Sequence, residues 1–160
     1  MKTFSVLINK KIKKFKKKVT VQSDKSISHR SLLIASQCVG ISSINNLLES
    51  EDVENTIICL KKLGVKIIKK NSNHMVYGNG LGSFKKNKKN ILYAGNSGTL
   101  ARMILPLIGT QSNLKFKIVG DKSLNKRDMK RIIEPLSKIG CNFFPKNKTT
   151  LPLTIEGTSM

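Results

Sequence analysis

The sequence predicts an α/β fold made of two copies of one βαβαββ unit. Two observations support this prediction: strand-like and helix-like apolar patterns alternate along the chain, and their order recurs. When Arg30 is placed on Arg102, two polar turns that each precede an apolar helix superpose. When Gly64 is placed on Gly140, two helix ends superpose. The repeat is therefore roughly 72 to 76 residues long.

The first copy covers about residues 19–90 and reads as strand, helix, strand, helix, strand, strand. Its second helix has the clearest limits. Ser50 is a suitable N-cap, acidic residues follow it in the first turn, and Gly64 ends the helical spacing. Strands are expected at 19–21, 41–47, 65–68 and 75–77, and helices at 28–37 and 50–63.

The second copy covers about residues 91–157 and repeats this order. A Gly-rich turn leads into its first helix, and Gly140 closes its second helix. Strands are expected at 92–93, 114–119, 141–144 and 153–155, with one helix at 99–107 and another within 123–139. Ahead of both copies, residues 1–18 are expected to form a basic N-terminal segment, with a short strand at 4–8 and then a lysine-rich run that is either a solvated strand edge or a tether.

The charge of the chain suggests one class of partner, and the composition argues against it. The 160 residues carry a formal net charge of +21, which is typical of proteins that bind nucleic acid or membrane surfaces. However, 26 of the basic residues are Lys and only 4 are Arg, the residue suited to planar recognition of phosphate and guanine. Aromatic residues make up only 5% of the chain, so stacking platforms for bases are scarce. No apolar run approaches the roughly 20 residues of a membrane span.

The cysteines predict reduced thiols in a cytoplasmic protein. Cys38, Cys59 and Cys141 are odd in number, and they form neither a CxxC pair nor a spacing linked to histidine. Neither a disulfide framework nor a zinc site is therefore indicated. Reduced thiols are typical of the cytosol. The N-terminal apolar stretch is too short for a signal peptide.

Turn one, residues 23–30, joins a strand to a helix and carries Lys25, Ser26 and Arg30. Ser26 and Arg30 are four residues apart, so on a helix they share a face. An ammonium, a hydroxyl and a guanidinium near helix N-terminal amides can bind phosphate or carboxylate. A solvated charged turn is the alternative interpretation.

Turn two, residues 95–99, is rich in glycine and is followed by Arg102 one helical turn later. Glycines let backbone amides approach an anion closely, although a plain glycine turn gives the same pattern. The motif is neither a Walker loop nor GxGxxG. Turn three, residues 120–127, follows a strand and enters a helix. Its Arg127 can close over an anion or pair with a neighbouring surface aspartate.

The two histidines carry separate expectations. His29 lies inside turn one, where it is either a general base or, as lone histidines usually are, a structural side chain. His74 is expected in an exposed turn. Neither has a companion at metal-ligand spacing, so no metal site is predicted.

Four motifs, taken together, resemble the 5-enolpyruvylshikimate-3-phosphate synthase (3-phosphoshikimate 1-carboxyvinyltransferase) family in order and spacing. They are DKSISHRSLLIAS, AGNSGTLAR, GDKSLNKRDMKRIIEPLSKIG and LPLTIEG. The resemblance runs from about residue 19 to residue 157 and is closest to the N-terminal part of that enzyme. It implies an enolpyruvate-transferase-like, inside-out α/β barrel domain built of three βαβαββ units, of which this chain holds two. Two such domains make up the family's enzymes.

The resemblance also implies an activity and a set of residues. The family transfers the enolpyruvyl group of phosphoenolpyruvate to the 5-hydroxyl of shikimate 3-phosphate and releases phosphate, on the shikimate pathway to chorismate and the aromatic amino acids. It uses neither cofactor nor metal, and a cytoplasmic monomer is expected at full length, with no nucleic acid or membrane partner. The implied residues are, for shikimate 3-phosphate, Lys25, Ser26 and Arg30; for phosphoenolpyruvate, Lys25 (also catalytic), Gly98 and Arg127; and, as supporting residues, Asp52, Asn96 and Arg102.

Two departures from the family pattern bear on activity. The family has proline after the arginine of its third motif, where this chain has Asp128, and an acid there is expected to weaken the grip of Arg127 on an anion. The family's Ser-Ala-Gln motif, its catalytic carboxylates and its second domain lie beyond Gly157. The 160 residues alone are therefore expected to be an inactive fragment that binds the substrates weakly at best. The alternatives are a UDP-N-acetylglucosamine enolpyruvyl transferase-like protein and a Lys-rich nucleic-acid-binding protein.

Overall fold

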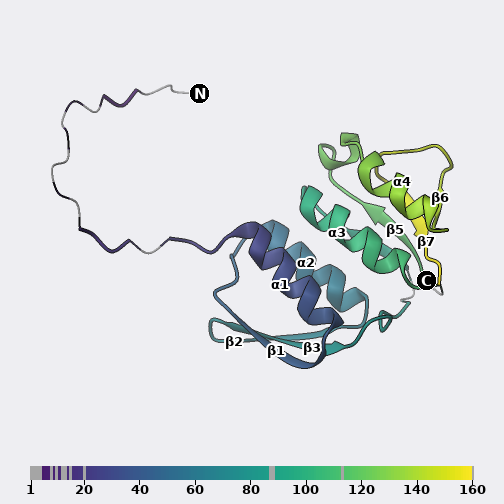
Figure 1. Cartoon of the computed structure of the whole chain (residues 1–160), viewed down its shortest axis with the longest axis horizontal. Coiled ribbons are helices and arrows are strands. Elements are labelled where there is room, and N and C mark those ends of the chain that lie inside the picture. Colours follow the sequence, from purple (N-terminus) through teal and green to yellow (C-terminus); the bar gives the residue numbers. More distant parts are fainter. Residues whose placement is uncertain are drawn as a thin grey trace.

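A computed structural model gives the architecture of the chain (Figure 1). It describes residues 5–7, 9, 11, 14, 16–19, 21–86, 89–112 and 114–159. Two α/β units follow each other along the chain, and each places two helices on one face of a small sheet. The α/β class predicted from the sequence is confirmed.

The first unit has two helices and a sheet of antiparallel strands. The order across the sheet is β1-β3-β2, with Ile41 opposite Tyr77 and Ile67 opposite Val76. Ser50 caps the second helix, because its hydroxyl accepts a hydrogen bond from the N–H of Val53. The elements are α1 (Lys25–Gln37), β1 (Val39–Asn45), α2 (Glu51–Lys62), β2 (Lys66–Lys70) and β3 (Asn73–Asn79).

The second unit has the full predicted order of elements. Its sheet runs β4-β5-β7-β6, with β4 parallel to β5 and the other pairs antiparallel. The elements are β4 (Ile91–Tyr93), α3 (Gly98–Gly109), β5 (Lys115–Val119), the 3-10 helix η1 (Leu124–Lys126), α4 (Lys130–Lys138), β6 (Asn142–Phe144) and β7 (Leu153–Glu156).

Two equivalent glycines show how closely the units match. In the first unit, a side chain on Gly78 of β3 would collide with the carbonyl oxygens of Ala35 and Cys38 at the end of α1. In the second unit, a side chain on Gly157 would collide with the corresponding oxygens of Ile108 and Gln111 at the end of α3. The same strand-to-helix approach therefore occurs twice, which supports the repeat that the sequence indicates.

The first unit departs from the prediction at its start. The order β1-β3-β2 matches β5-β7-β6, but no strand in the described part of the chain takes the place of β4 beside β1. The strand expected at 19–21 is wrong for Val19 and Val21, which lie outside any strand, and Thr20 lies outside the described residues. A strand is stable only when it pairs with a neighbouring strand, and an apolar sequence pattern does not show whether such a neighbour exists. Of the strand expected at 4–8, only residues 5–7 are described, and they are not a strand.

The limits of two helices can be compared with the prediction. α1 begins three residues earlier than expected, because the carboxylate of Asp24 accepts a hydrogen bond from the N–H of Ile27 and acts as the N-cap. The helix expected within 123–139 is α4, and the short helix η1 precedes it. Between η1 and α4, Asp128 forms an isolated β-bridge with Thr150, so the backbone there is not helical.

The core lies between the two sheets and joins the units. α2 contacts both β2 and β4, and α3 contacts α1 as well as β5 and β7. Leu32, Leu60, Ile104 and Phe116 are among the fully buried side chains. The helices α1, α2 and α3 therefore share one apolar interior with both sheets.

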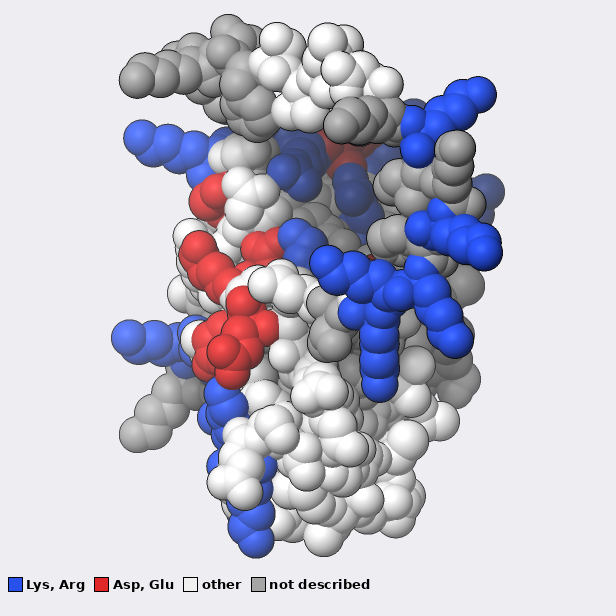
Figure 2. Space-filling model, turned by 90° about the vertical axis from the view of Figure 1, so that its left-hand side faces the viewer, with Lys and Arg blue, Asp and Glu red and all other residues white. Residues whose placement is uncertain are grey.

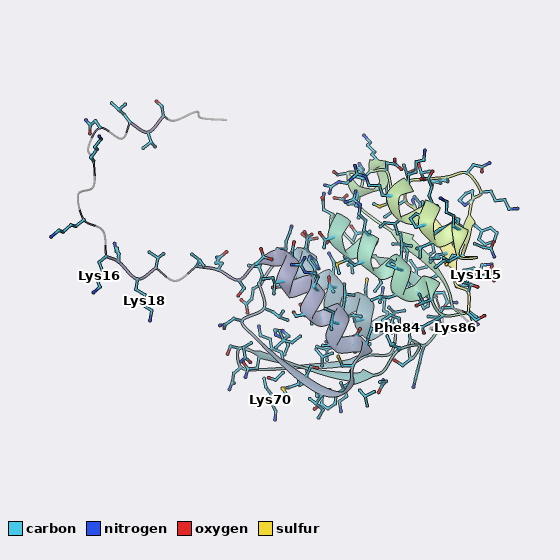
Figure 3. All side chains as sticks on the ribbon, in the orientation of Figure 1. Lys16, Lys18, Lys70, Phe84, Lys86 and Lys115 are labelled. Atoms are coloured by element: carbon cyan, nitrogen blue, oxygen red, sulfur yellow. The ribbon has the colours of Figure 1, made fainter. Side chains whose placement is uncertain are left out.

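Exposed lysine side chains lie on several parts of the molecule. Figure 3 shows Lys16 and Lys18 on the N-terminal segment, Lys70 at the first sheet and Lys115 at the opposite end of the molecule, all of them exposed. None of the helices in the described part of the chain is both long and apolar enough to cross a membrane.

Candidate anion-binding site

Turn one places an ion pair at the start of two helices. Lys25 is the first residue of α1, and its ammonium donates a hydrogen bond of 2.6 Å to the carboxylate of Asp52 in the first turn of α2. The Lys25 side chain is half exposed, whereas the Asp52 side chain is 19% exposed. Asp52 thus fixes the direction of the ammonium, and the rest of the ammonium surface remains open to solvent.

The other two candidates of turn one lie on the same helix. Ser26 and Arg30 both belong to α1, so the predicted spacing of four residues places them on one face. Arg30 is exposed and Ser26 is half-buried. The N–H of Ile27 is already bonded to Asp24, so the cationic and hydroxyl side chains, and not that amide, are the groups that turn one offers to an anion.

Turns two and three meet at Gly98. A methyl group in place of its hydrogen would lie 3.2 Å from a guanidinium nitrogen of Arg127 and 3.3 Å from one of Arg102. Gly98 is buried at the start of α3, while both arginines are exposed. Two guanidinium groups from different elements therefore converge on a residue that has no side chain, and together they can bind an anion.

A hydrogen-bond chain holds Arg127 in this position. The guanidinium of Arg127 donates to the side-chain oxygen of Asn96 at 2.8 Å, and the amide of Asn96 donates to the carboxylate of Asp121 at 2.7 Å. The backbone N–H of Asp121 donates to the carbonyl oxygen of Gly95, which ties turn three to turn two. Asn96 is thus placed between a cation and an acid, and it fixes the direction of the cation.

The carboxylates of turn three are held in their charged form. The N–H of Leu124 is the main reason that the pKa of Asp121 lies below its ordinary value, with smaller contributions from Asn96 and Arg127. The pKa of Asp128 is also lowered, chiefly by the N–H of Lys130 and then by the side chain of Thr149. Asp128 is therefore engaged with the start of α4, and Asp121 is the acid that acts on Arg127.

His29 connects the turns beneath the surface. It is fully buried on α1, with Nδ1 2.6 Å from the hydroxyl of Thr56 and Nε2 3.4 Å from the hydroxyl of Ser97. Burial is the main cause of its lowered pKa, which Asp52 partly raises and Lys25 lowers further. Of the two interpretations open from the sequence, the structural one fits this buried ring.

Further acidic side chains lie beside the site, because Glu51 and Glu54 share the first turn of α2 with Asp52. Figure 2 shows a group of Asp and Glu side chains on this face, with Lys and Arg side chains around them. Glu49, Glu51 and Glu54 line a cavity of about 380 Å³ together with Lys69 and His74. His74 is buried, so the prediction that it is exposed is wrong: it points inward from β3, where Val76 and Gly78 are also buried.

Sequence reasoning missed several residues that shape the site. Asp24 as a cap, Thr56 as a partner of His29, and Ser97 as the N-cap of α3 were not singled out. The signals for Asp24 and Ser97 were present, because each is a polar residue directly before a helix. Nothing in the sequence indicates the contact of His29 with Thr56, since it depends on how α1 packs against α2.

The fold and these turns define an α/β repeat domain whose cations cluster at helix starts. The family model of EPSP synthase (3-phosphoshikimate 1-carboxyvinyltransferase) matches residues 9–160, and the chain belongs to this family. It is 41% identical over 154 residues to a 3-phosphoshikimate 1-carboxyvinyltransferase of Syntrophomonas wolfei, covering 96% of this chain and 36% of that protein. It is 45% identical over 134 residues to one of Oenococcus oeni, covering 84% of this chain and 30% of that protein.

A solved structure gives the same result for the fold. EPSP synthase from Acinetobacter baumannii superposes with a TM-score of 0.79 at 35% identity, over 87% of this chain and 31% of that one. The chain thus spans about a third of the length of the relatives it matches.

Proposed function

We propose that this chain supplies part of a site at which the enolpyruvyl group of phosphoenolpyruvate is transferred to the 5-hydroxyl of shikimate 3-phosphate, with release of phosphate. The observation that supports this most is the convergence of Arg127 and Arg102 on Gly98, at the end of the molecule where Lys25 is held by Asp52. Both substrates are anions, and cations arranged in advance stabilise the charge that develops on a leaving phosphate.

The proposed roles follow the positions of the side chains. Lys25, Ser26 and Arg30 contact shikimate 3-phosphate from the start of α1, and Lys25 also reaches phosphoenolpyruvate, as the catalytic residue of this chain. Gly98 and Arg127 contact phosphoenolpyruvate. The supporting residues act through these: Asp52 orients Lys25, Asn96 orients Arg127, and Arg102 adds charge beside Gly98.

We further propose that the 160 residues bind these anions only weakly and do not turn them over alone. They span about a third of their relatives' length, and the resemblance places further carboxylates and arginines of the site outside them. Measuring phosphate release from both substrates tests this, and a rate like that of a full-length family enzyme would contradict it. A cytoplasmic location is part of the proposal and is supported by three free cysteines. We also propose that the full-length protein is a monomer, on the basis of the family resemblance alone.

The thermal stability of the chain separates this proposal from the alternatives. A ligand that binds only the folded state raises the melting temperature. We expect shikimate 3-phosphate to raise it in a saturable manner, and Lys25→Met to reduce that rise while Lys70→Met, on a distant strand, does not. A rise with UDP-N-acetylglucosamine alone would favour the amino-sugar enzyme. A rise with a DNA oligonucleotide that disappears steeply with salt would favour a nucleic-acid-binding protein.

A further inference from the structure

His29 is positioned to connect the two units at the site. It belongs to α1 of the first unit, one turn after Lys25 and next to Arg30. On one side its ring contacts Thr56 of α2, the helix that carries Asp52. On the other side it contacts Ser97, the N-cap of α3 in the second unit.

The hydrogen bonds around the ring fit a single protonation state. The hydroxyl of Thr56 donates to the carbonyl oxygen of Asp52 at 3.2 Å, so it accepts from His29 Nδ1. The hydroxyl of Ser97 accepts from the N–H of Leu100 at 3.2 Å and is free to donate to His29 Nε2. In the neutral ring with its proton on Nδ1, each of these hydroxyl groups donates once and accepts once.

A protonated ring would disturb this arrangement. Nε2 would then carry a hydrogen directed at the Ser97 hydroxyl, which would have to turn its own hydrogen elsewhere. Ser97 is only 2% exposed, so water is not available to receive it. A buried polar group without a partner is costly, and burial of the ring also disfavours its charged form.

We propose that His29 is a positioning residue, which holds the Lys25–Asp52 ion pair of the first unit and the Gly98–Arg127 turn of the second unit in one arrangement through Thr56 and Ser97. The effect of this role on substrate binding rests on the proposed function. It assigns no proton transfer to His29, because the ring is fully buried and both nitrogens have protein partners.

The first test uses variants of His29 in the full chain. His29→Leu removes both hydrogen bonds, whereas His29→Asn places an amide near the position of Nδ1 and retains a donor to Thr56. We expect His29→Leu to weaken shikimate 3-phosphate binding on the order of tenfold, and His29→Asn to recover a large part of that loss. The control is Leu33→Val on the same helix, which loses a buried methylene group and stability but removes no hydrogen bond to Thr56 or Ser97.

Binding is measured by calorimetry well below the melting temperature of every variant. Equal affinity in His29→Leu and the wild type would overturn the proposal. So would an equal loss of affinity in Leu33→Val, because general loosening would then account for the effect.

The second test does not need a substrate. Nitrogen-15 NMR of the wild-type imidazole is expected to show the neutral form with the proton on Nδ1 at pH 7, and amide exchange at Leu100 is expected to accelerate in His29→Leu but not in Leu33→Val. If wild-type chain binds no shikimate 3-phosphate while these NMR results hold, the proposed function fails and the connection through His29 stands. The opposite tautomer, or unchanged exchange at Leu100, would overturn the connection itself.

Discussion

The ammonium of Lys25 lies 2.6 Å from the carboxylate of Asp52, and this contact joins the start of α1 to the start of α2. The two residues are 27 positions apart in the sequence, and packing of the two helices brings them together. The pair is partly exposed, so it contributes little to folding stability. The ion pair instead fixes the direction of the Lys25 side chain, at the surface of the helix that also carries Ser26 and Arg30.

The first prediction compares two lysines that both form ion pairs. Lys25→Met is expected to weaken shikimate 3-phosphate binding about ten- to a hundredfold, since a hydrogen bond between two charged groups is lost. Lys69 pairs with Glu49 at 2.8 Å and is equally exposed, away from the turns. Lys69→Met is expected to leave the affinity unchanged, as measured by calorimetry. Equal effects of both substitutions would show that overall charge, and not turn one, determines binding.

The second prediction concerns the two ends of α3. In Gly98→Ala the new methyl group lies against the guanidinium groups of Arg127 and Arg102, so phosphoenolpyruvate binding is expected to fall while the melting temperature changes little. In Gly109→Ala the methyl group would lie 3.0 Å from the sulfur of Cys141, inside the core. That variant is expected to lose stability, by about 1–3 kcal/mol, and to keep its affinity. A reversed pattern in denaturant melts and titrations would contradict the assignment of Gly98.

The third prediction tests whether Asn96 orients Arg127. Asn96→Ala removes the 2.8 Å bond to the guanidinium and is expected to weaken phosphoenolpyruvate binding about three- to tenfold. Arg127→Ala is expected to weaken it more. In the double variant the two losses should not add, because Asn96 acts only through Arg127. Additive losses in a double-mutant cycle would show that the two residues act independently.

The fourth prediction concerns acid stability. The pKa values of Asp121 and Asp128 are held below their ordinary value of 3.8. A carboxyl group with a lower pKa in the folded than in the unfolded state stabilises the fold above the unfolded pKa, and this contribution is lost as the pH falls through the folded pKa. The melting temperature is therefore expected to drop below about pH 4, and less steeply in Asp121→Asn. The same slope in that variant would contradict the role given to Asp121.

The fifth prediction uses the cysteines to test the packing. Burial raises the pKa of Cys59 to about 11, and Cys141 is also buried with a raised pKa. Cys38 is exposed. At pH 8 a thiol-specific reagent is expected to label Cys38 alone, and Cys38→Ser should abolish labelling until the chain is unfolded. Rapid labelling of Cys59 in the native chain would show that the interior between the units is open.

Local signals predicted most of the fold. Ser50 as an N-cap and Gly64 and Gly140 after helix ends were read from the sequence, and both glycines have the positive φ angle that a helix end favours. The prediction was wrong where structure depends on distant partners: Val19 and Val21 have the apolar pattern of a strand but lie outside any strand. The helix expected within 123–139 forms as α4, and its start follows the residue Asp128 that bridges to Thr150.

The candidate site shows the same division. The order of the three turns and their cations was readable, because Lys25, Gly98 and Arg127 lie in recognisable motifs. The sequence does not show which of these residues are in contact in the folded chain. Arg127 is held by Asn96, and His29 is buried between α1, α2 and α3, only because the units pack as they do.

We propose that cations at these turns bind the anions of the enolpyruvyl transfer reaction, and a calorimetric titration of the full chain with shikimate 3-phosphate tests this most directly. We expect saturable binding at one site per chain in the wild type, strongly weakened in Lys25→Met and unchanged in Lys70→Met. No binding by the folded wild-type chain, or equal binding by both variants, would contradict it.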